Sequence, residues 1–296
     1  MDVTQDDVRW MELALALSKT GLGRAWPNPA VGCLLVRDGC VVGQACTGPG
    51  GRPHAEQLAV LQAGELAEGA TAYVSLEPCS HWGVTSPCTL VLHQAKVSRV
   101  VIATRDPDPR VDGSGIDRLR HYGIEVKLGV LDEEARELHA GFITRVRRGR
   151  PLLTVAPTSA AGALCDWAFA TGQDAVLISL PAHREELSHS HVIPRILVDL
   201  YAGPGEPEPI PPSKGLPRVA FPRWLVLADG RSAGPLASVD EIFEVAAAKE
   251  RIDVKAVLAA LGGRGLTRVA VAANDPLAVM LREAGLVDRD GVSAVP

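Results

Sequence analysis

The sequence contains few aromatic residues, no long hydrophobic run and no excess of positive charge. Aromatic residues make up 4% of the 296 positions. No stretch reaches the roughly 18 consecutive apolar residues that a membrane-spanning helix needs. The first ten residues include three aspartates and lack the apolar core of a secretory signal. We therefore expect no association with a membrane, and we expect a cytoplasmic location.

Cysteine is also scarce. Six cysteines in a chain of this length are too few for a disulfide scaffold, and without a signal sequence the expected compartment is reducing. The thiols should then be free or bound to metal. Cys33, Cys40 and Cys46 do not have the spacing of metal ligands relative to one another. We expect them to be small, buried or half-buried residues in and beside a hairpin.

The charge balance argues against a general nucleic-acid-binding surface. Residues 1–150 contain 17 Lys and Arg against 18 Asp and Glu, and residues 151–296 contain 13 against 17. Neither half shows the basic excess that such a surface normally needs. One short basic cluster is interpreted as a helix end followed by a linker, where cations suit the helix dipole. It consists of Arg145, Arg147, Arg148 and Arg150.

The length is enough for two ordinary domains, and the patterns predict a division into residues 1–149 and 150–296. The first part opens with an amphipathic helix at 7–20 and a hairpin whose strands, 31–36 and 40–45, flank Asp38-Gly39. Helices are expected at 54–62, 88–95, 115–122 and 133–145, and strands at 72–76, 97–103 and 125–128. Strands that alternate with helices after a hairpin predict a three-layer α/β domain.

The second part is also predicted to be α/β. Strands are expected at 152–155, 175–180, 195–201, 224–228 and 268–272, and helices at 252–261 and 276–284. The segment 203–223 contains seven prolines in 21 residues and is expected to be a loop.

Residues able to bind a metal ion fall in three segments, 53–56, 77–83 and 86–88. One imidazole and two thiolates, from His54, Cys79 and Cys88, form a donor set that suits zinc. Three protein ligands leave the fourth position open, which is typical of a catalytic zinc. We therefore predict one zinc ion per chain. His81 is a possible fourth ligand, but we interpret it as a pocket residue because the loop is tight.

Glu56 follows His54 by two residues and would lie on the same first helical turn. The pattern His-x-Glu, followed by Pro-Cys and a second Cys, is typical of zinc deaminases. In that chemistry zinc activates a water molecule for attack on a ring carbon that bears an amine. The glutamate carries protons to the ring nitrogen and to the leaving ammonia. The alternatives are a structural zinc knuckle or plain core cysteines.

Eight residues separate Cys79 from Cys88, instead of the two found in cytidine deaminases. With this gap, the run Glu-Pro-Cys-Ser-His-Trp-Gly-Val-Thr-Ser-Pro-Cys closely resembles the deaminase half of the riboflavin-biosynthesis bifunctional deaminase–reductases. Further matches are Pro-Asn-Pro-Ala-Val-Gly at 27–32, His-Ala-Glu at 54–56 and Arg-Asp-Pro-Asp-Pro at 105–109. The resemblance covers roughly residues 7–150. It implies the cytidine-deaminase fold with a mixed sheet, zinc, and deamination of 2,5-diamino-6-ribosylamino-4(3H)-pyrimidinone 5′-phosphate.

The resemblance also implies residues that contact the substrate. Asn28 matches a family residue that contacts the pyrimidine, although it could instead be a turn asparagine between two prolines. Ala55, beside the zinc histidine, and Asp106, in the Asp-Pro-Asp-Pro run, are expected at the same site, together with His81.

Three positions depart from the family pattern. Family members usually have Lys or Arg where Val84 stands, often His where Thr47 stands, and Asn where Asp108 stands. All three are expected around the ribose phosphate. A lost cation and a gained carboxylate each disfavour a dianionic phosphate, by about 1.5–3 kcal/mol per charge-assisted hydrogen bond. Unless Arg105 or Arg110 intervenes, the substrate should differ from the family's, as in a paralogue that serves a specialised pathway.

Residues 150–296 resemble the family's reductase domain only in their position in the chain and in the order of their predicted strands and helices. The lysine expected after the opening strand is Ala156, and the aspartate of Ser-Leu-Asp-Gly is absent from 159–162. Ala-Ala-Asn-Asp at 272–275 replaces the Glu-Gly-Gly that meets the cofactor phosphate, so the backbone cannot approach a pyrophosphate closely. We predict a degenerate, truncated reductase-like domain without NADPH. The alternative is nucleotide binding through a different pattern.

The leading hypothesis is therefore a zinc-dependent hydrolase that deaminates a small heterocyclic amine and forms a homo-oligomer. A nucleic-acid or free-base deaminase is a second hypothesis, against which the near-neutral first half argues. A catalytically inactive assembly protein is a third. The complete set of His54, Glu56, Cys79 and Cys88 argues against that one.

Overall fold

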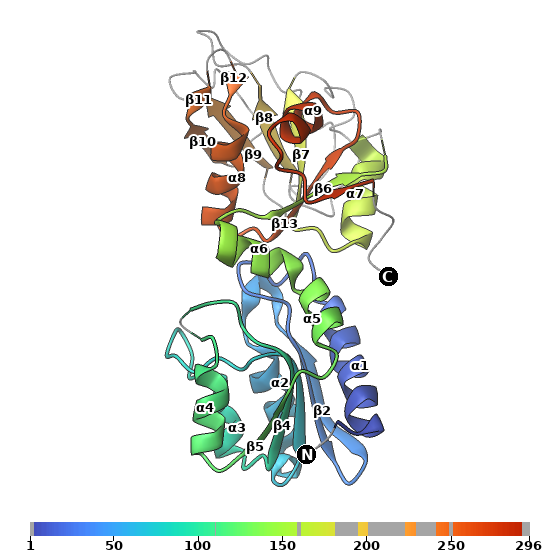
Figure 1. The fold of residues 1–296 in the computed structure, drawn as a ribbon, viewed down its shortest axis with the longest axis vertical. Coiled ribbons are helices and arrows are strands. Elements are labelled where there is room, and N and C mark those ends of the chain that lie inside the picture. The colour runs from blue at the N-terminus through green and yellow to red at the C-terminus, as the bar shows by residue number, and fades with distance from the viewer. Residues whose placement is uncertain are drawn as a thin grey trace, which may run out of the picture. The chain divides into compact units, whose positions relative to one another are not determined.

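The computed structural model describes residues 3–109, 111–158, 161–180, 195–200, 223–228, 241–248 and 251–291. It divides into two compact units, Met1–Arg147 and Arg148–Pro296 (Figure 1). The expected loop 203–223 lies outside the described residues except for Arg223, which begins a strand. Within the described part of the chain, no helix is both long and apolar enough to cross a membrane.

The first unit is built on a mixed five-stranded sheet in the order β2-β1-β3-β4-β5. Its strands are β1 (Gly32–Arg37), β2 (Cys40–Cys46), β3 (Thr71–Leu76), β4 (Arg99–Thr104) and β5 (Glu125–Leu128). β1 is antiparallel to β2 and β3, whereas β3, β4 and β5 are parallel. The hairpin turn is the predicted one, because Asp38 and Gly39 both have positive φ, at 51° and 73°.

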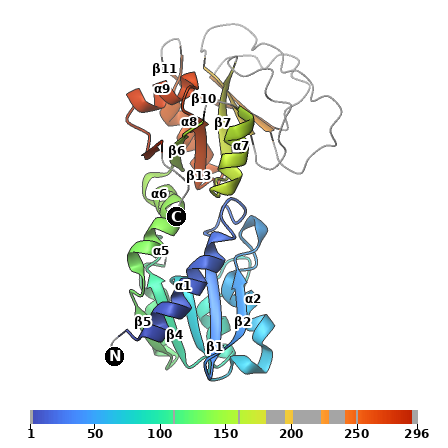
Figure 2. The same cartoon turned by 90° about the vertical axis from the view of Figure 1, so that its right-hand side faces the viewer.

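Helices cover both faces of this sheet (Figure 2). They are α1 (Gln5–Lys19), α2 (Ala55–Ala63), α3 (Cys88–Gln94), α4 (Ser114–His121), α5 (Asp132–Leu138) and α6 (Ala140–Arg148), with short 3₁₀ turns at Pro49–Gly51 and Gly64–Ala67. Alternate residues of β1 face opposite sides. Cys33 and Leu35 pack with α2, α3 and α4, whereas Leu34 and Val36 pack with α1 and α5. The predicted three-layer α/β fold is confirmed.

Two details of the first unit differ from expectation. The helix predicted over 133–145 is two helices, because the chain leaves the helix at His139, whose buried ring contacts Ser75 Oγ at 3.2 Å. Cys40, expected to be at least half-buried, is exposed. It begins edge strand β2 directly after the turn, where no element of the described residues covers it.

The second unit contains a seven-stranded sheet in the order β10-β9-β8-β7-β13-β6-β14, in which every described pair is parallel. Its strands are β6 (Leu152–Ala156), β7 (Ala175–Leu180), β8 (Arg195–Asp199), β9 (Arg223–Ala228), β10 (Glu241–Val245), β13 (Arg268–Ala272) and β14 (Arg289–Asp290). A small hairpin pairs β11 (Ala247–Ala248) with β12 (Arg251–Ile252).

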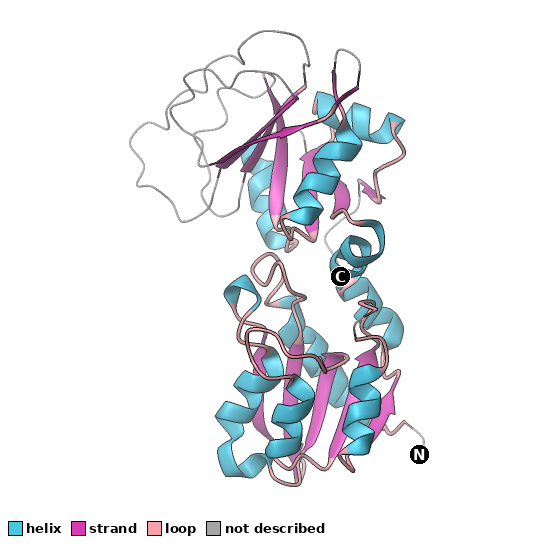
Figure 3. Ribbon diagram, turned by 90° about the vertical axis from the view of Figure 1, so that its left-hand side faces the viewer, coloured by secondary structure: helices cyan, strands magenta, loops and turns pink. Residues whose placement is uncertain are grey.

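Among the described residues, three helices accompany this sheet: α7 (Ala161–Ala170), α8 (Val254–Gly263) and α9 (Pro276–Glu283) (Figure 3). Sequence patterns missed α7 because its run Ala-Gly-Ala-Leu-Cys-Asp-Trp-Ala-Phe-Ala has a single charged residue and therefore no polar stripe. The short strands β10 and β14 were missed as well. Two arginines of the basic cluster form ion pairs with Asp288, Arg148 at 2.9 Å and Arg150 at 2.5 Å.

Candidate metal centre and active site

Three local structures bring the metal-binding side chains together. His54 is the N-cap residue of α2, Cys79 lies in the loop after β3, and Cys88 is the first residue of α3. His54 Nδ1 lies 3.3 Å from Cys88 Sγ and 3.6 Å from Cys79 Sγ. All three ligand atoms lie within 4.8 Å of one another. One imidazole nitrogen and two sulfurs at these separations fit a zinc ion.

The electrostatics of the cluster favour a thiolate. A hydrogen bond from the Cys88 thiol, assisted by one from His54, lowers the pKa of Cys79 well below its ordinary value. The same thiol pair, together with burial, raises the pKa of Cys88. The hydrogen bond to Cys79 raises the pKa of His54. The backbone N–H of Cys88, at the start of α3, also donates to Cys79 Sγ at 3.3 Å. The positive end of this helix therefore supports a negative sulfur.

Glu56 lies beside this cluster in the first turn of α2. Its side chain is buried, with 3% of its surface exposed. Burial raises the pKa of Glu56, and the nearby Cys79 raises it further. His54 Nε2 is also buried and has no hydrogen-bond partner among the described residues. A buried carboxyl group next to three metal-binding atoms is placed to exchange protons with a molecule bound there.

Glu77, which the sequence interpretation left without a role, joins two loops of the site. Its buried carboxylate accepts backbone N–H bonds from two glycines, at 3.0 Å from Gly113 and 3.0 Å from Gly115. Ile116 and Asp106 donate to it as well, at 3.2 and 3.4 Å. The loop that carries Cys79 is thereby tied to the loop that follows β4. No local pattern could reveal this tie, because the donors lie 29 to 39 residues away.

The loop after β4 carries two of the expected substrate residues. Asp106 is buried and accepts a hydrogen bond from the backbone N–H of Asp108 at 2.8 Å. Burial raises the pKa of Asp106 to about 7, with Asp108 and Glu77 adding to the effect. Arg105 forms a long ion pair with Asp112, at 3.9 Å. Arg110 lies outside the described residues.

Other expected substrate residues lie at the same end of the sheet. Asn28 donates from Nδ2 to the Gly51 carbonyl at 2.9 Å, in the turn that precedes His54. Thr47 Oγ1 accepts from the backbone N–H of Val31 at 2.9 Å, and its side chain is buried. Ala55 is also buried, in the first turn of α2. Their roles toward a substrate stay predictions.

Residues 81–84, between the two cysteines, are exposed to solvent. His81 is exposed, and so are Trp82 at 73% and Val84 at 82% of their surfaces. The structure does not bring His81 into the group formed by His54, Cys79 and Cys88. A role for His81 as a pocket residue stays a prediction.

The first unit matches the zinc-binding region of a known class of deaminases. Residues 4–104 match the cytidine and deoxycytidylate deaminase zinc-binding region. The first unit is therefore a zinc-binding deaminase domain. The chain is 43% identical over 146 residues to the diaminohydroxyphosphoribosylamino-pyrimidine deaminase of Buchnera aphidicola, a match that covers 49% of this chain and 99% of that protein. The chain belongs to this deaminase family of riboflavin biosynthesis.

The family also includes longer relatives. The riboflavin biosynthesis protein RibD of Aquifex aeolicus is 47% identical over 153 residues, which are 52% of this chain and 43% of that protein. The chain thus covers less than half of that relative. RibD of Acinetobacter baumannii matches in structure with a TM-score of 0.73 and 26% identity, over 99% of this chain and 88% of its own. The resemblance to the bifunctional deaminase–reductases is confirmed.

Proposed function

We propose that this protein hydrolytically deaminates the diaminohydroxyphosphoribosylaminopyrimidine of riboflavin biosynthesis, using one zinc ion per chain. The observation that carries the proposal is the convergence of His54, Cys79 and Cys88 beside the buried carboxyl group of Glu56. The relatives at 43% and 47% identity support this substrate over the altered one that Val84 and Asp108 suggested.

The residues of the site divide the chemistry between them. His54 Nδ1 and the two sulfurs would hold zinc, which activates water and polarises an oxygen when bound. Glu56 accepts a proton from the attacking water and donates it to a ring nitrogen. The same carboxyl group then moves the remaining proton of the added hydroxyl to the amine, so that the C–N bond breaks, ammonia leaves and the ring carbon becomes a carbonyl. Water thus replaces one amine of the pyrimidine, and no oxidant or reductant takes part.

We propose that the second unit performs no NADPH chemistry and serves contacts between subunits of a homo-oligomer. Asp275, after β13, supports the absence of NADPH chemistry. Its buried carboxylate accepts the backbone N–H groups of Leu277 at 2.8 Å and Ser179 at 3.1 Å. A carboxylate therefore occupies the N-terminus of α9, where a cofactor phosphate would otherwise be favoured.

The test is ammonia release from the phosphorylated diaminopyrimidine, followed by mass spectrometry of the product. The expected product is heavier by the small difference between oxygen and an N–H group, and Glu56→Gln serves as the inactive control. Zinc-loaded protein that releases no ammonia would support the assembly-protein alternative. A gel shift with tRNA or single-stranded DNA, together with deamination of that nucleic acid, would instead favour the nucleic-acid deaminase.

A further inference from the structure

Arg52 reaches from the turn before α2 to the loop between the two cysteines. It follows the 3₁₀ turn Pro49–Gly51 and stands two residues before His54. Its Nη1 donates a hydrogen bond to Thr85 Oγ1 at 3.2 Å. Its Nη2 lies 3.5 Å from the point that a Cβ on Gly83 would occupy. The guanidinium group is therefore held directly beside residues 83–85, where Val84 replaces the cation expected by resemblance.

The positive charge of Arg52 has no acidic partner among the residues that the structure describes. The ion pairs described there involve Lys96 or other arginines, and Arg105 already faces Asp112 at 3.9 Å. The Arg52 side chain is only partly buried, and it lies close enough to His54 for its charge to act on the imidazole. An unpaired guanidinium group at the edge of an active site is suited to bind an anion.

Thr85 completes the site. Its Oγ1 accepts the hydrogen bond from Arg52, so its own hydroxyl hydrogen can be donated to a bound oxygen. Exposed Trp82 and Val84 leave this part of the loop accessible. Because Arg52 makes one hydrogen bond within the described part of the chain, its other N–H groups can bind a phosphate, through two oxygens at once.

We propose that Arg52 and Thr85 form the binding site for the phosphomonoester of the substrate, with Arg52 supplying the charge that Val84 lacks. This inference rests on the proposed deaminase function. It makes Arg52 a specificity-determining residue that discriminates between phosphorylated and unphosphorylated aminopyrimidines. It also explains how the family's substrate remains compatible with Val84.

The first experiment measures kcat and KM for the phosphorylated diaminopyrimidine and for its dephosphorylated form. Arg52→Gln should lower kcat/KM for the phosphorylated form by about tenfold or more, mainly through KM. In the same variant, kcat/KM for the dephosphorylated form should change by less than about twofold. The matched control is Arg37→Gln, which removes the same charge at the hairpin turn, where Arg37 at the end of β1 pairs with Cys40 at the start of β2. An unchanged preference in Arg52→Gln would overturn the proposal.

A second experiment moves the positive charge from position 52 to position 84, and therefore tests the site by a gain of binding as well as by a loss. Adding Val84→Lys to Arg52→Gln should recover most of the lost preference for the phosphorylated form, because the cation returns to the same loop. In the wild-type background Val84→Lys should change the preference by less than about threefold. A large gain there, with no effect of Arg52→Gln, would show that the wild-type site lacks a phosphate-binding cation.

A binding measurement separates this inference from the deaminase function. Ribose 5-phosphate, titrated calorimetrically into the zinc-loaded protein, should bind to wild type and to Arg37→Gln, and at least about tenfold more weakly to Arg52→Gln. If neither pyrimidine is deaminated, the proposed function fails. Weaker binding of ribose 5-phosphate by Arg52→Gln than by wild type would still support the anion site. Equal binding by wild type and Arg52→Gln would overturn the anion site even in an active deaminase.

Discussion

Gly115 donates its backbone N–H to Glu77 Oε1 at 3.0 Å, and the two residues meet where the metal-binding loop touches the start of α4. A Cβ on Gly115 would lie less than 3.0 Å from the Pro78 carbonyl oxygen, so a larger residue cannot occupy this position without a shift of the backbone. Pro78 directly precedes Cys79. The close approach therefore helps to fix the position of a metal-binding residue.

We expect Glu77→Gln to destabilise the first unit. The amide would turn one N–H₂ group toward backbone donors that now face a carboxylate, and hydrogen bonds to a charged group contribute about 1.5–3 kcal/mol each. The free energy of unfolding, measured in urea, should fall by at least about 2 kcal/mol. Exposed Glu68, paired with Lys96 at 3.0 Å, provides the matched control. Glu68→Gln should cost less than about 1 kcal/mol, and an equal loss in both variants would contradict the role of Glu77.

Glu56→Gln should abolish deamination while the protein keeps its zinc. The amide has a similar shape but cannot accept and return the proton, and general acid–base catalysis is worth about 10²–10⁴ in rate. Ammonia release and metal content measured on the same sample check both halves of this expectation. Retention of more than about a tenth of the activity would show that another group moves the proton.

Removal of any metal-binding side chain should instead remove the metal. Wild type purified without chelator should contain about one zinc per chain, and His54→Ala, Cys79→Ala and Cys88→Ala should each contain far less. Metal analysis by mass spectrometry provides the count. Exposed Cys40 supplies the control, because Cys40→Ala removes a thiol outside the cluster. Zinc loss in Cys40→Ala, or full zinc in the three variants, would disprove the ligand set.

Sequence reasoning succeeded where the signal is local. The His-x-Glu pair lies within one helical turn, and Asp38-Gly39 has the backbone conformation that its hairpin turn requires. It failed for partners far apart in the chain. The Asp7–Arg99 pair joins residues 92 positions apart, and Arg52 meets Thr85 across 33. Such pairs depend on how strands and loops pack, which periodicity and residue type do not encode.

The second unit should neither bind nor oxidise NADPH. Asp275 occupies the N-terminus of α9, and its negative charge would repel a phosphate brought to the same backbone N–H groups. We expect no loss of NADPH absorbance in the presence of the deaminated product and no thermal shift with NADPH. Saturable binding below about 100 μM, which corresponds to about 5.5 kcal/mol, would contradict this expectation.

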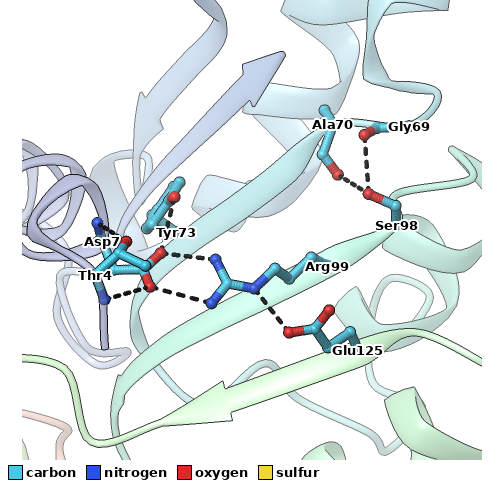
Figure 4. A network of polar contacts seen from close by, with 8 residues as sticks. All are labelled: Thr4, Asp7, Gly69, Ala70, Tyr73, Ser98, Arg99 and Glu125. Atoms are coloured by element: carbon cyan, nitrogen blue, oxygen red, sulfur yellow. Dashed lines mark hydrogen bonds and ion pairs between the residues drawn. The ribbon is translucent and has the colours of Figure 1, made fainter. Parts of the chain in front are cut away.

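Asp7 and Arg99 form an ion pair in the first unit in which the carboxylate is buried (Figure 4). Arg99 donates from Nη1 to Asp7 Oδ1 at 2.7 Å and from Nη2 to Oδ2 at 3.1 Å. Tyr73 adds its hydroxyl, and Thr4 its backbone N–H. The Asp7 side chain is 1% exposed. Burial alone would raise the pKa of Asp7, but the hydrogen bonds from Arg99 and Thr4 outweigh it and lower the pKa from 3.8 to about 2.

This lowered pKa makes the stability of the fold depend on acidity. Because the folded protein holds the ionised carboxylate more strongly than the unfolded chain does, the stabilisation is fully present above about pH 4. It is lost as the pH falls through about 2, and it amounts to roughly 2 kcal/mol. Asp7→Asn should therefore reduce the free energy of unfolding at pH 7 by about 2–4 kcal/mol, since it leaves Arg99 without its buried partner. The difference from wild type should shrink as the pH is lowered from 4 to 2.

Urea unfolding of both proteins at several pH values measures this difference. Glu125→Gln is the matched control, because Glu125 contacts the same arginine at 3.0 Å but is 42% exposed. An exposed pair contributes less than about 1 kcal/mol, so this variant should stay close to wild type at every pH. If the Asp7→Asn difference stayed constant down to pH 2, the lost stability would come from packing or hydrogen bonds that do not require the charge. The ion pair would then not be the source of the acid sensitivity.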